Sequence, residues 1–141
     1  MFRDDYLMRL IKQFAELLAR AAGFNRKGEH EKALQETARA WGELFHDIPR
    51  ELVDVVDSAT LASMLREPQR MRIAAQLLVE EGRAIRGKGD PATAAMRTKR
   101  ALELYLEARA ISPEPDDETV IFELSREVHG NQLDERYQTA R

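Results

Sequence analysis

Two segments of the chain repeat one another. Residues 27–40 read KGEHEKALQETARA and residues 88–101 read KGDPATAAMRTKRA, so Lys, Gly, Ala, Thr, Arg and Ala recur at the same places. In each copy a Gly follows one helical pattern and precedes the next, which is typical of a tight turn between two antiparallel helices. The repeat therefore predicts two related helical hairpins within one chain.

The rest of the chain also has apolar residues at the spacing of amphipathic helices, and no segment alternates with the period of a strand. We predict a single all-α domain over residues 1–141. Its expected parts are a hairpin over 4–46, two short helices over 49–66, a hairpin over 68–111, a capping helix over 116–129 and a polar, frayed tail over 130–141. Within these parts, Gly23 is expected to interrupt the first helix and Ser58 to cap a short one.

Small residues occupy equivalent places in the two predicted hairpins. They are Ala21, Gly28, Ala33 and Ala40 in the first hairpin, and Gly82, Gly89, Ala94 and Ala101 in the second. This pattern resembles the tetratricopeptide repeat, in which small residues let antiparallel helices approach closely. Tetratricopeptide repeats follow one another every ~34 residues, whereas these units are 61 residues apart (28 and 89), and Phe45 and Leu106 stand where each unit would end in Pro. The resemblance implies two divergent units.

A second resemblance rests on longer stretches. The segments DYLMRLIKQFAELLARAAG, LLVEEG and ALELYLEA are similar to an uncharacterised bacterial family of helical-hairpin proteins. That family has no assigned function, so the resemblance adds to the expected fold and not to the function.

The composition disfavours several classes of function. The chain has no Cys, which excludes disulfides and thiolate zinc sites. Its acidic and basic residues are interspersed and its net charge is −3, which argues against nucleic-acid binding. No segment approaches the ~20 apolar residues of a membrane span, and the N-terminal MFRDDYLMRLIK does not resemble a signal peptide. We expect a cytoplasmic protein with no nucleic-acid and no membrane partner.

The candidate motifs for catalysis or metal binding lack the neighbouring residues or the spacing that such sites require. Residues 82–88, GRAIRGK, match the start of a phosphate-binding loop, but Gly89 replaces the hydroxyl residue and the segment reads as a helix end. The other candidates are His30, His46 and His129, and the carboxylate clusters Glu80-Glu81 and Asp116-Asp117-Glu118. None has the spacing of a metal site or of a catalytic pair. We therefore expect a non-enzymatic protein with no catalytic residue, metal or cofactor; a ligand pocket between the hairpins is the least favoured alternative.

The resemblance to tetratricopeptide proteins supplies a candidate binding surface. There the first helix of each unit lines a groove that holds a peptide or a partner helix, and the matching positions are Gln76, Val79, Arg83 and Arg86 in the second unit and Ala15, Leu18, Ala22 and Asn25 in the first. Arg83 and Arg86 share one helix face, with Lys88 close by, and can pair with carboxylates of an acidic partner segment. The function expected is a protein–protein interaction or scaffolding module. The alternative for these cations is an ordinary solvated face.

The first helix suggests self-association instead. Its apolar stripe is wider than one packing partner requires, and the candidate dimer face consists of Tyr6, Leu7, Leu10, Ile11 and Phe14. Surplus apolar width of this kind can pack against a second copy, giving a homodimer. A membrane-surface role is disfavoured because acidic residues offset the basic ones along this helix.

Overall fold

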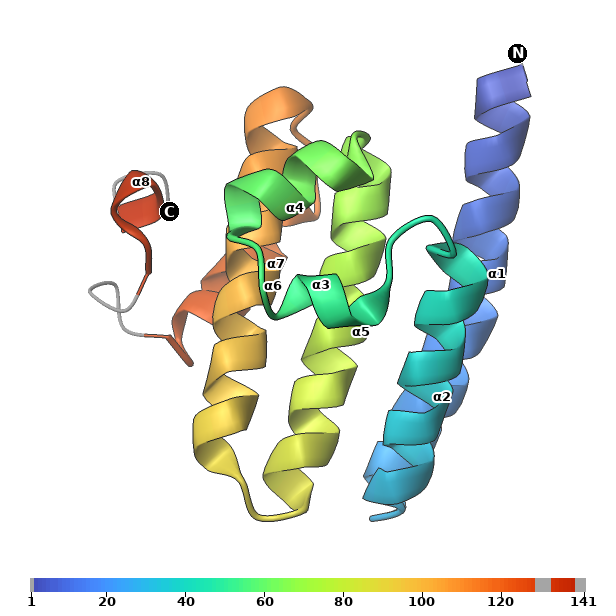
Figure 1. Ribbon diagram of the computed structural model, residues 1–141, viewed down its shortest axis with the longest axis vertical. Helices are drawn as coiled ribbons and strands as arrows, with labels where there is room; N and C mark the ends of the chain where they lie inside the picture. The colour runs from blue at the N-terminus through green and yellow to red at the C-terminus, as the bar shows by residue number, and fades with distance from the viewer. Residues whose placement is uncertain (1, 129–132, 139–141) are drawn as a thin grey trace.

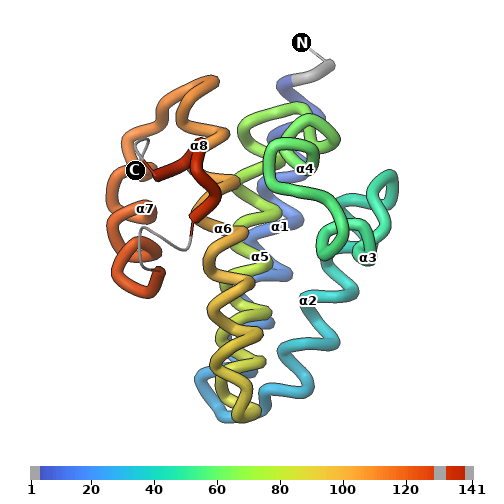
Figure 2. The backbone as a smooth tube through the Cα atoms, turned by 60° about the vertical axis from the view of Figure 1, so that its left-hand side comes forward, coloured from blue at the N-terminus to red at the C-terminus, as the bar shows by residue number. Residues whose placement is uncertain are grey.

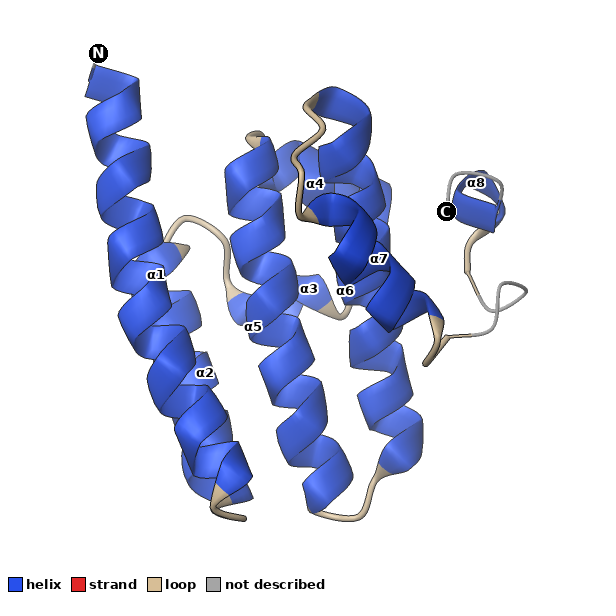
Figure 3. Ribbon diagram, turned by 180° about the vertical axis from the view of Figure 1, so that it is seen from behind, coloured by secondary structure: helices blue, strands red, loops and turns tan. Residues whose placement is uncertain are grey.

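The computed structural model describes residues 2–128 and 133–138, and every regular element among them is a helix (Figure 1). The helices are α1 (Phe2–Arg26), α2 (His30–Leu44), α3 (Arg50–Val53), α4 (Ser58–Leu65), α5 (Pro68–Gly87), α6 (Pro91–Ile111), α7 (Asp117–Ser125) and α8 (Glu135–Gln138). The prediction of an all-α fold is confirmed. The long helices α1, α2, α5 and α6 stand side by side, with α3 and α4 across one face and α7 across the opposite face (Figures 1 and 3).

The two repeated segments form turns at the same end of the molecule (Figure 2). Gly28, between α1 and α2, has φ of 76°, and Gly89, between α5 and α6, has φ of 96°. These values lie in the left-handed region that Gly adopts without a steric penalty. The expectation that both Gly residues serve the turns is confirmed. We call α1 with α2 the first helix pair, and α5 with α6 the second.

The small residues of the repeat allow the helices to pack closely. Ala33, Ala40, Ala94 and Ala101 are fully buried. Gly82 lies against α6, where an added Cβ would be 3.4 Å from the Ala94 carbonyl oxygen. Helices that meet through such small side chains pack near the short end of normal interaxial distances.

The aromatic residues at the end of α2 close the core between the two pairs. The rings of Trp41 and Phe45 lie 4.7 Å apart, and both residues are buried. The Trp41 indole N–H donates to the Ile48 carbonyl oxygen at 2.8 Å, which satisfies its one polar atom. The largest fully buried apolar side chains are Phe45, Leu61, Leu65, Met71, Leu77, Leu78, Leu102 and Leu104.

Two predicted details at helix ends need correction. Gly23 does not interrupt α1, because the helix continues through it to Arg26. Ser58 is not a cap. The carboxylate of Asp57 caps α4 by accepting from the Thr60 N–H at 2.7 Å, whereas the Ser58 hydroxyl donates to buried Glu103 at 2.7 Å.

The expectation of a polar, frayed tail is wrong for residues 133–138. Leu133 and Tyr137 are buried, and the Tyr137 hydroxyl donates to Glu107 on α6 at 2.6 Å. Burial and this carboxylate neighbour raise the pKa of Tyr137. The predicted capping helix also ends earlier, at Ser125, while His129 lies outside the described residues.

Candidate interaction cleft

A cleft of about 490 Å³ lies between the second helix pair and α7. Its lining comes from α5 (Val79, Gly82, Arg83 and Arg86), from α6 (Thr98), and from α7 and the residues just after it (Glu123, Leu124, Arg126 and Glu127). The α5 residues share one helix face because they recur at spacings of three and four. The cleft is therefore one face of α5 with α7 as its opposite wall.

A buried ion pair fixes the start of α7. The Arg72 guanidinium donates to both oxygens of Asp117, at 2.8 and 2.7 Å, and also to the Ser112 carbonyl oxygen at 2.6 Å. Burial by itself raises the pKa of Asp117, but hydrogen bonds from Arg72 and the Glu114 N–H, with the charges of Arg72 and Arg109, outweigh it and lower the pKa. Leu124 is buried farther along α7 and completes the wall.

The cations of the cleft are exposed, and they differ in how closely they are paired. The side chains of Arg83 and Arg86 are 62% and 49% exposed. Arg83 contacts Glu80, whereas Arg86 reaches Glu127 at a distance of 4.0 Å between Nη2 and Oε2. The side chain of Arg126 has no acidic partner in the part of the chain that the structure describes. An incoming carboxylate thus meets guanidinium groups that are accessible to it.

A hydrogen-bonded chain connects Arg83 to the first helix pair. The Asn25 amide nitrogen donates to the carbonyl oxygen of Glu80 at 3.0 Å and to its carboxylate at 2.9 Å. The amide oxygen of Asn25 lies 2.9 Å from Nδ1 of His30, so this ring nitrogen carries the proton. Ala22, Asn25 and Arg83 also line a hollow of about 340 Å³ between the two pairs. Candidate groove positions of the two units therefore adjoin at Arg83.

The structure brings together some of the predicted binding residues and separates others. Val79, Arg83 and Arg86 meet in the cleft. Gln76 faces a different hollow, where its amide nitrogen donates to the Tyr105 hydroxyl at 2.8 Å. Lys88 pairs with exposed Glu31 where the two turns adjoin.

Residues from α6 and α7 complete the cleft but were not predicted from the sequence. They are Thr98, Glu123, Leu124, Arg126 and Glu127. Their only sequence signal is the four-residue spacing of Glu123 and Glu127, which would place both on one face of a continuous helix, although α7 ends at Ser125. Spacing within α7 does not reveal which helix it packs against.

Some residues of the predicted dimer face are buried in the core and others are exposed. Leu10 is buried in the core, and Leu7 and Phe14 are partly buried against it. Tyr6 and Ile11 remain exposed, together with Met8 of the same apolar stripe. Any partner of α1 therefore meets a narrower apolar surface than the sequence pattern indicates.

The carboxylates of Glu80 and Glu81 are both held by contacts with cationic or amide side chains. Glu80 contacts Arg83 and Asn25, while Glu81 accepts from Arg50 and Arg97. Residues 82–87 belong to α5, so the segment that resembles a phosphate-binding loop is helical. No group of three or more His, Asp or Glu side chains with the arrangement of a metal site occurs among residues 2–128 and 133–138.

In comparisons with known proteins, no family model, curated protein or solved structure matches this chain. Among the helices that the structure describes, none is both long enough and apolar enough to cross a membrane.

Proposed function

We propose that the protein is a non-catalytic interaction or scaffolding module that binds an acidic segment of a partner protein in the cleft. The observation that carries the proposal is the convergence of Val79, Arg83 and Arg86 from α5 with Arg126 from beside α7. A guanidinium group offers a planar fork of donors that matches a carboxylate, and such charge-assisted pairs are the stronger class of hydrogen bond.

The ion pair between Arg86 and Glu127 does not block such a partner. Arg86 and Glu127 are 4.0 Å apart, and both side chains are about half exposed. Exposed pairs of this kind contribute about 0–1 kcal/mol. A partner carboxylate that makes a closer contact with Arg86 can therefore replace Glu127 at little cost.

The packing supports a tetratricopeptide-like arrangement of the two units. Equivalent Ala residues are buried in both pairs, and equivalent Gly residues serve both turns. In such an arrangement the first helices of successive units form the binding surface, which agrees with the position of Arg83 beside both hollows. We infer that the cleft is the second unit's part of that surface.

The test uses a fluorescein-labelled, Glu-rich decapeptide as the probe and fluorescence anisotropy as the readout. We expect Arg83→Glu with Arg86→Glu to weaken binding about tenfold or more, a loss of about 1.4 kcal/mol. We expect Glu127→Gln to strengthen binding by up to about fivefold, because it removes the competing carboxylate. Added salt is expected to weaken wild-type binding.

The matched control is Lys27→Glu with Lys32→Glu, which changes the net charge equally on exposed residues outside the cleft. This variant is expected to bind nearly as well as wild type. Equal weakening in both double variants would show that the probe responds only to net charge, and the proposal would then fail. Capture from a lysate of the native host with the same variants then identifies the partner.

A further inference from the structure

The first part of α1 extends beyond the helix that it packs against. The Gln13 amide nitrogen lies 3.3 Å from Glu43, which is one residue before the end of α2 at Leu44. Residues 4–12, which we call the overhang, therefore lie beyond the end of α2, as Figures 1 and 3 show. On the overhang Tyr6, Met8 and Ile11 are 42%, 66% and 38% exposed. Met8 and Ile11 are three residues apart and share one side of α1, whereas Tyr6 lies on another side. Adjoining exposed apolar side chains commonly mark an interaction surface.

A mainly apolar groove of about 240 Å³ lies directly beside the overhang. Ile11 and Phe14 of α1 form one wall and Ile73 of α5 the other, with Tyr105 at its base. The carboxylates of Glu114 and Asp116, just before α7, stand at its edge and are exposed. The groove thus combines apolar walls with an acidic rim.

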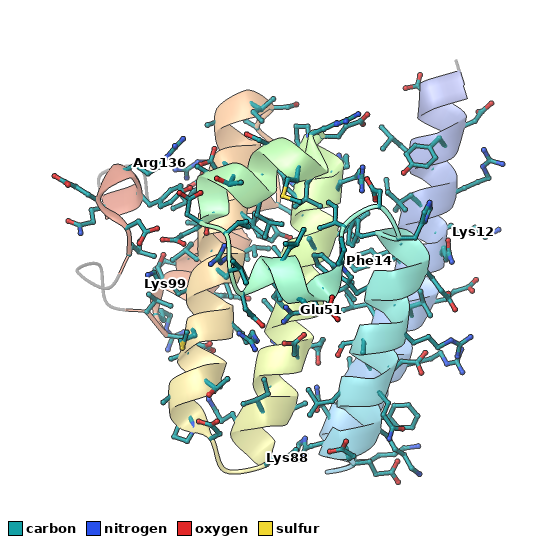
Figure 4. All side chains as sticks on the ribbon, in the orientation of Figure 1. Lys12, Phe14, Glu51, Lys88, Lys99 and Arg136 are labelled. Carbon is teal, nitrogen blue, oxygen red and sulfur yellow. The ribbon has the colours of Figure 1, made fainter. Side chains whose placement is uncertain are left out.

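The overhang carries the complementary charge. Lys12 lies four residues after Met8, so both are on one face of α1, and Figure 4 shows Lys12 pointing away from the body of the molecule. Lys12 makes no ion pair with any described side chain. The overhang therefore presents an apolar surface flanked by an exposed cation, and the groove presents an apolar surface flanked by carboxylates.

We propose that the overhang of one copy docks into the groove of a second copy, giving a two-fold symmetric dimer. Ile11 belongs to both surfaces, so overhang and groove are contiguous on one side of the molecule. Across a two-fold axis, the overhang of each copy can contact the groove of the other, so the same contact is made twice and the assembly closes at two copies. Lys12 of each copy then lies near Asp116 of the other.

The first experiment measures the molar mass of the full chain by light scattering and sedimentation, from about 1 µM to about 1 mM. We expect a wild-type dimer whose dissociation constant rises at least about tenfold with Met8→Asp or with Ile11→Asp. The controls are Met96→Asp and Phe122→Asp, which alter similarly exposed apolar residues on α6 and α7. They are expected to dimerise as wild type does, with circular dichroism confirming the fold of each variant.

A charge exchange separates this docking mode from non-specific apolar association. Lys12→Glu and Asp116→Lys are each expected to weaken the dimer, and the double variant Lys12→Glu/Asp116→Lys is expected to regain it. A wild-type chain that stays monomeric up to about 1 mM would overturn the proposal. So would a dimer that the α6 or α7 controls disrupt, or one that the charge exchange does not restore.

Discussion

At the scale of single residues, Gly87 ends α5 at a position with no space for a side chain. A Cβ added there would lie 2.2 Å from Nε2 of His30, which is far inside normal contact distances. His30 is held in place by its hydrogen bond to Asn25. Gly87 therefore allows the second helix pair to rest directly on an imidazole of the first.

We expect Gly87→Ala to lower the free energy of unfolding by about 1–3 kcal/mol, because the imidazole must move out of a well-packed contact. In the double variant His30→Ala/Gly87→Ala, part of that loss is expected to return. Urea denaturation of the two single variants and the double variant gives the coupling between the sites.

The matched control is Gly42→Ala in α2, where an added Cβ meets no atom within 4 Å. We expect it to stabilise the protein by about 0.5–1 kcal/mol, since Ala has the better helix propensity. If Gly87→Ala is also stabilising, the close approach of His30 is not a feature of the protein in solution.

At the scale of helices, the position of α7 depends on a charge pair that the sequence pattern conceals. Arg72 and Asp117 are 45 residues apart, and both are buried. The pKa of Asp117 is lower in the folded protein than its ordinary value of 3.8. The ionised carboxylate therefore stabilises the fold at pH values above 3.8. The contribution is lost as the pH falls below 3.8 and through the lower pKa of the folded state.

We expect Asp117→Asn to lower the free energy of unfolding at pH 7 by about 3–5 kcal/mol, because the Arg72 charge is left buried without its counter-ion. The difference from wild type is expected to shrink as the pH falls below 3.8 and through the lower pKa of Asp117 in the folded protein. Urea denaturation at pH 7 and at a series of acidic pH values measures both effects.

Glu118→Gln serves as the control, since Glu118 is an exposed neighbour that pairs with Arg109. It is expected to change stability by less than about 1 kcal/mol. A difference between Asp117→Asn and wild type that stays constant across this pH range would contradict the assigned role of the carboxylate.

The helices themselves were predictable, because apolar spacing and the turn residues Gly28 and Gly89 are local signals. The partners of α7 and α8 were not, because they depend on contacts between distant polar residues. Arg72, Asp117 and Glu103 have the sequence character of surface residues, yet each is buried by a partner at least 30 residues away. The α8 segment had one local signal, the spacing of Leu133 and Tyr137.

The candidate site follows the same division. Arg83 and Arg86 could be placed on one face of a predicted helix, so their convergence was accessible from the sequence. The residues of α7 could not be assigned to the same cleft without knowing where that helix packs. Burial of Leu10 was equally hidden, since an apolar stripe does not show which of its members face the core.

At the scale of the whole molecule, the cleft and the overhang are separate surfaces. The cleft belongs to α5, α6 and α7, the overhang belongs to α1, and the groove proposed to receive the overhang shares no lining residue with the cleft. Figure 1 places the start of α1 on the far side of α5 from α6. The two proposed interactions therefore do not compete for the same residues.

We expect the two surfaces to act independently. Arg83→Glu with Arg86→Glu should leave the molar mass of the dimer unchanged, and Ile11→Asp should leave the affinity for the Glu-rich peptide within about twofold of wild type. Light scattering and anisotropy on the same samples test both statements. Loss of peptide binding in a folded Ile11→Asp variant would show instead that the cleft functions only in the dimer.

The buried carboxylate of Glu103 has a consequence for the order of events during synthesis. One of its oxygens accepts from Ser58, which the ribosome makes earlier, and the other accepts from the Asp134 N–H, 31 residues later in the chain. At about 5–20 residues per second, roughly 2–6 s separate these residues. The Ser58 contact can therefore form before the Asp134 contact, once both α4 and α6 have left the ribosome. We expect α6 then to present an acceptor for the segment that emerges later.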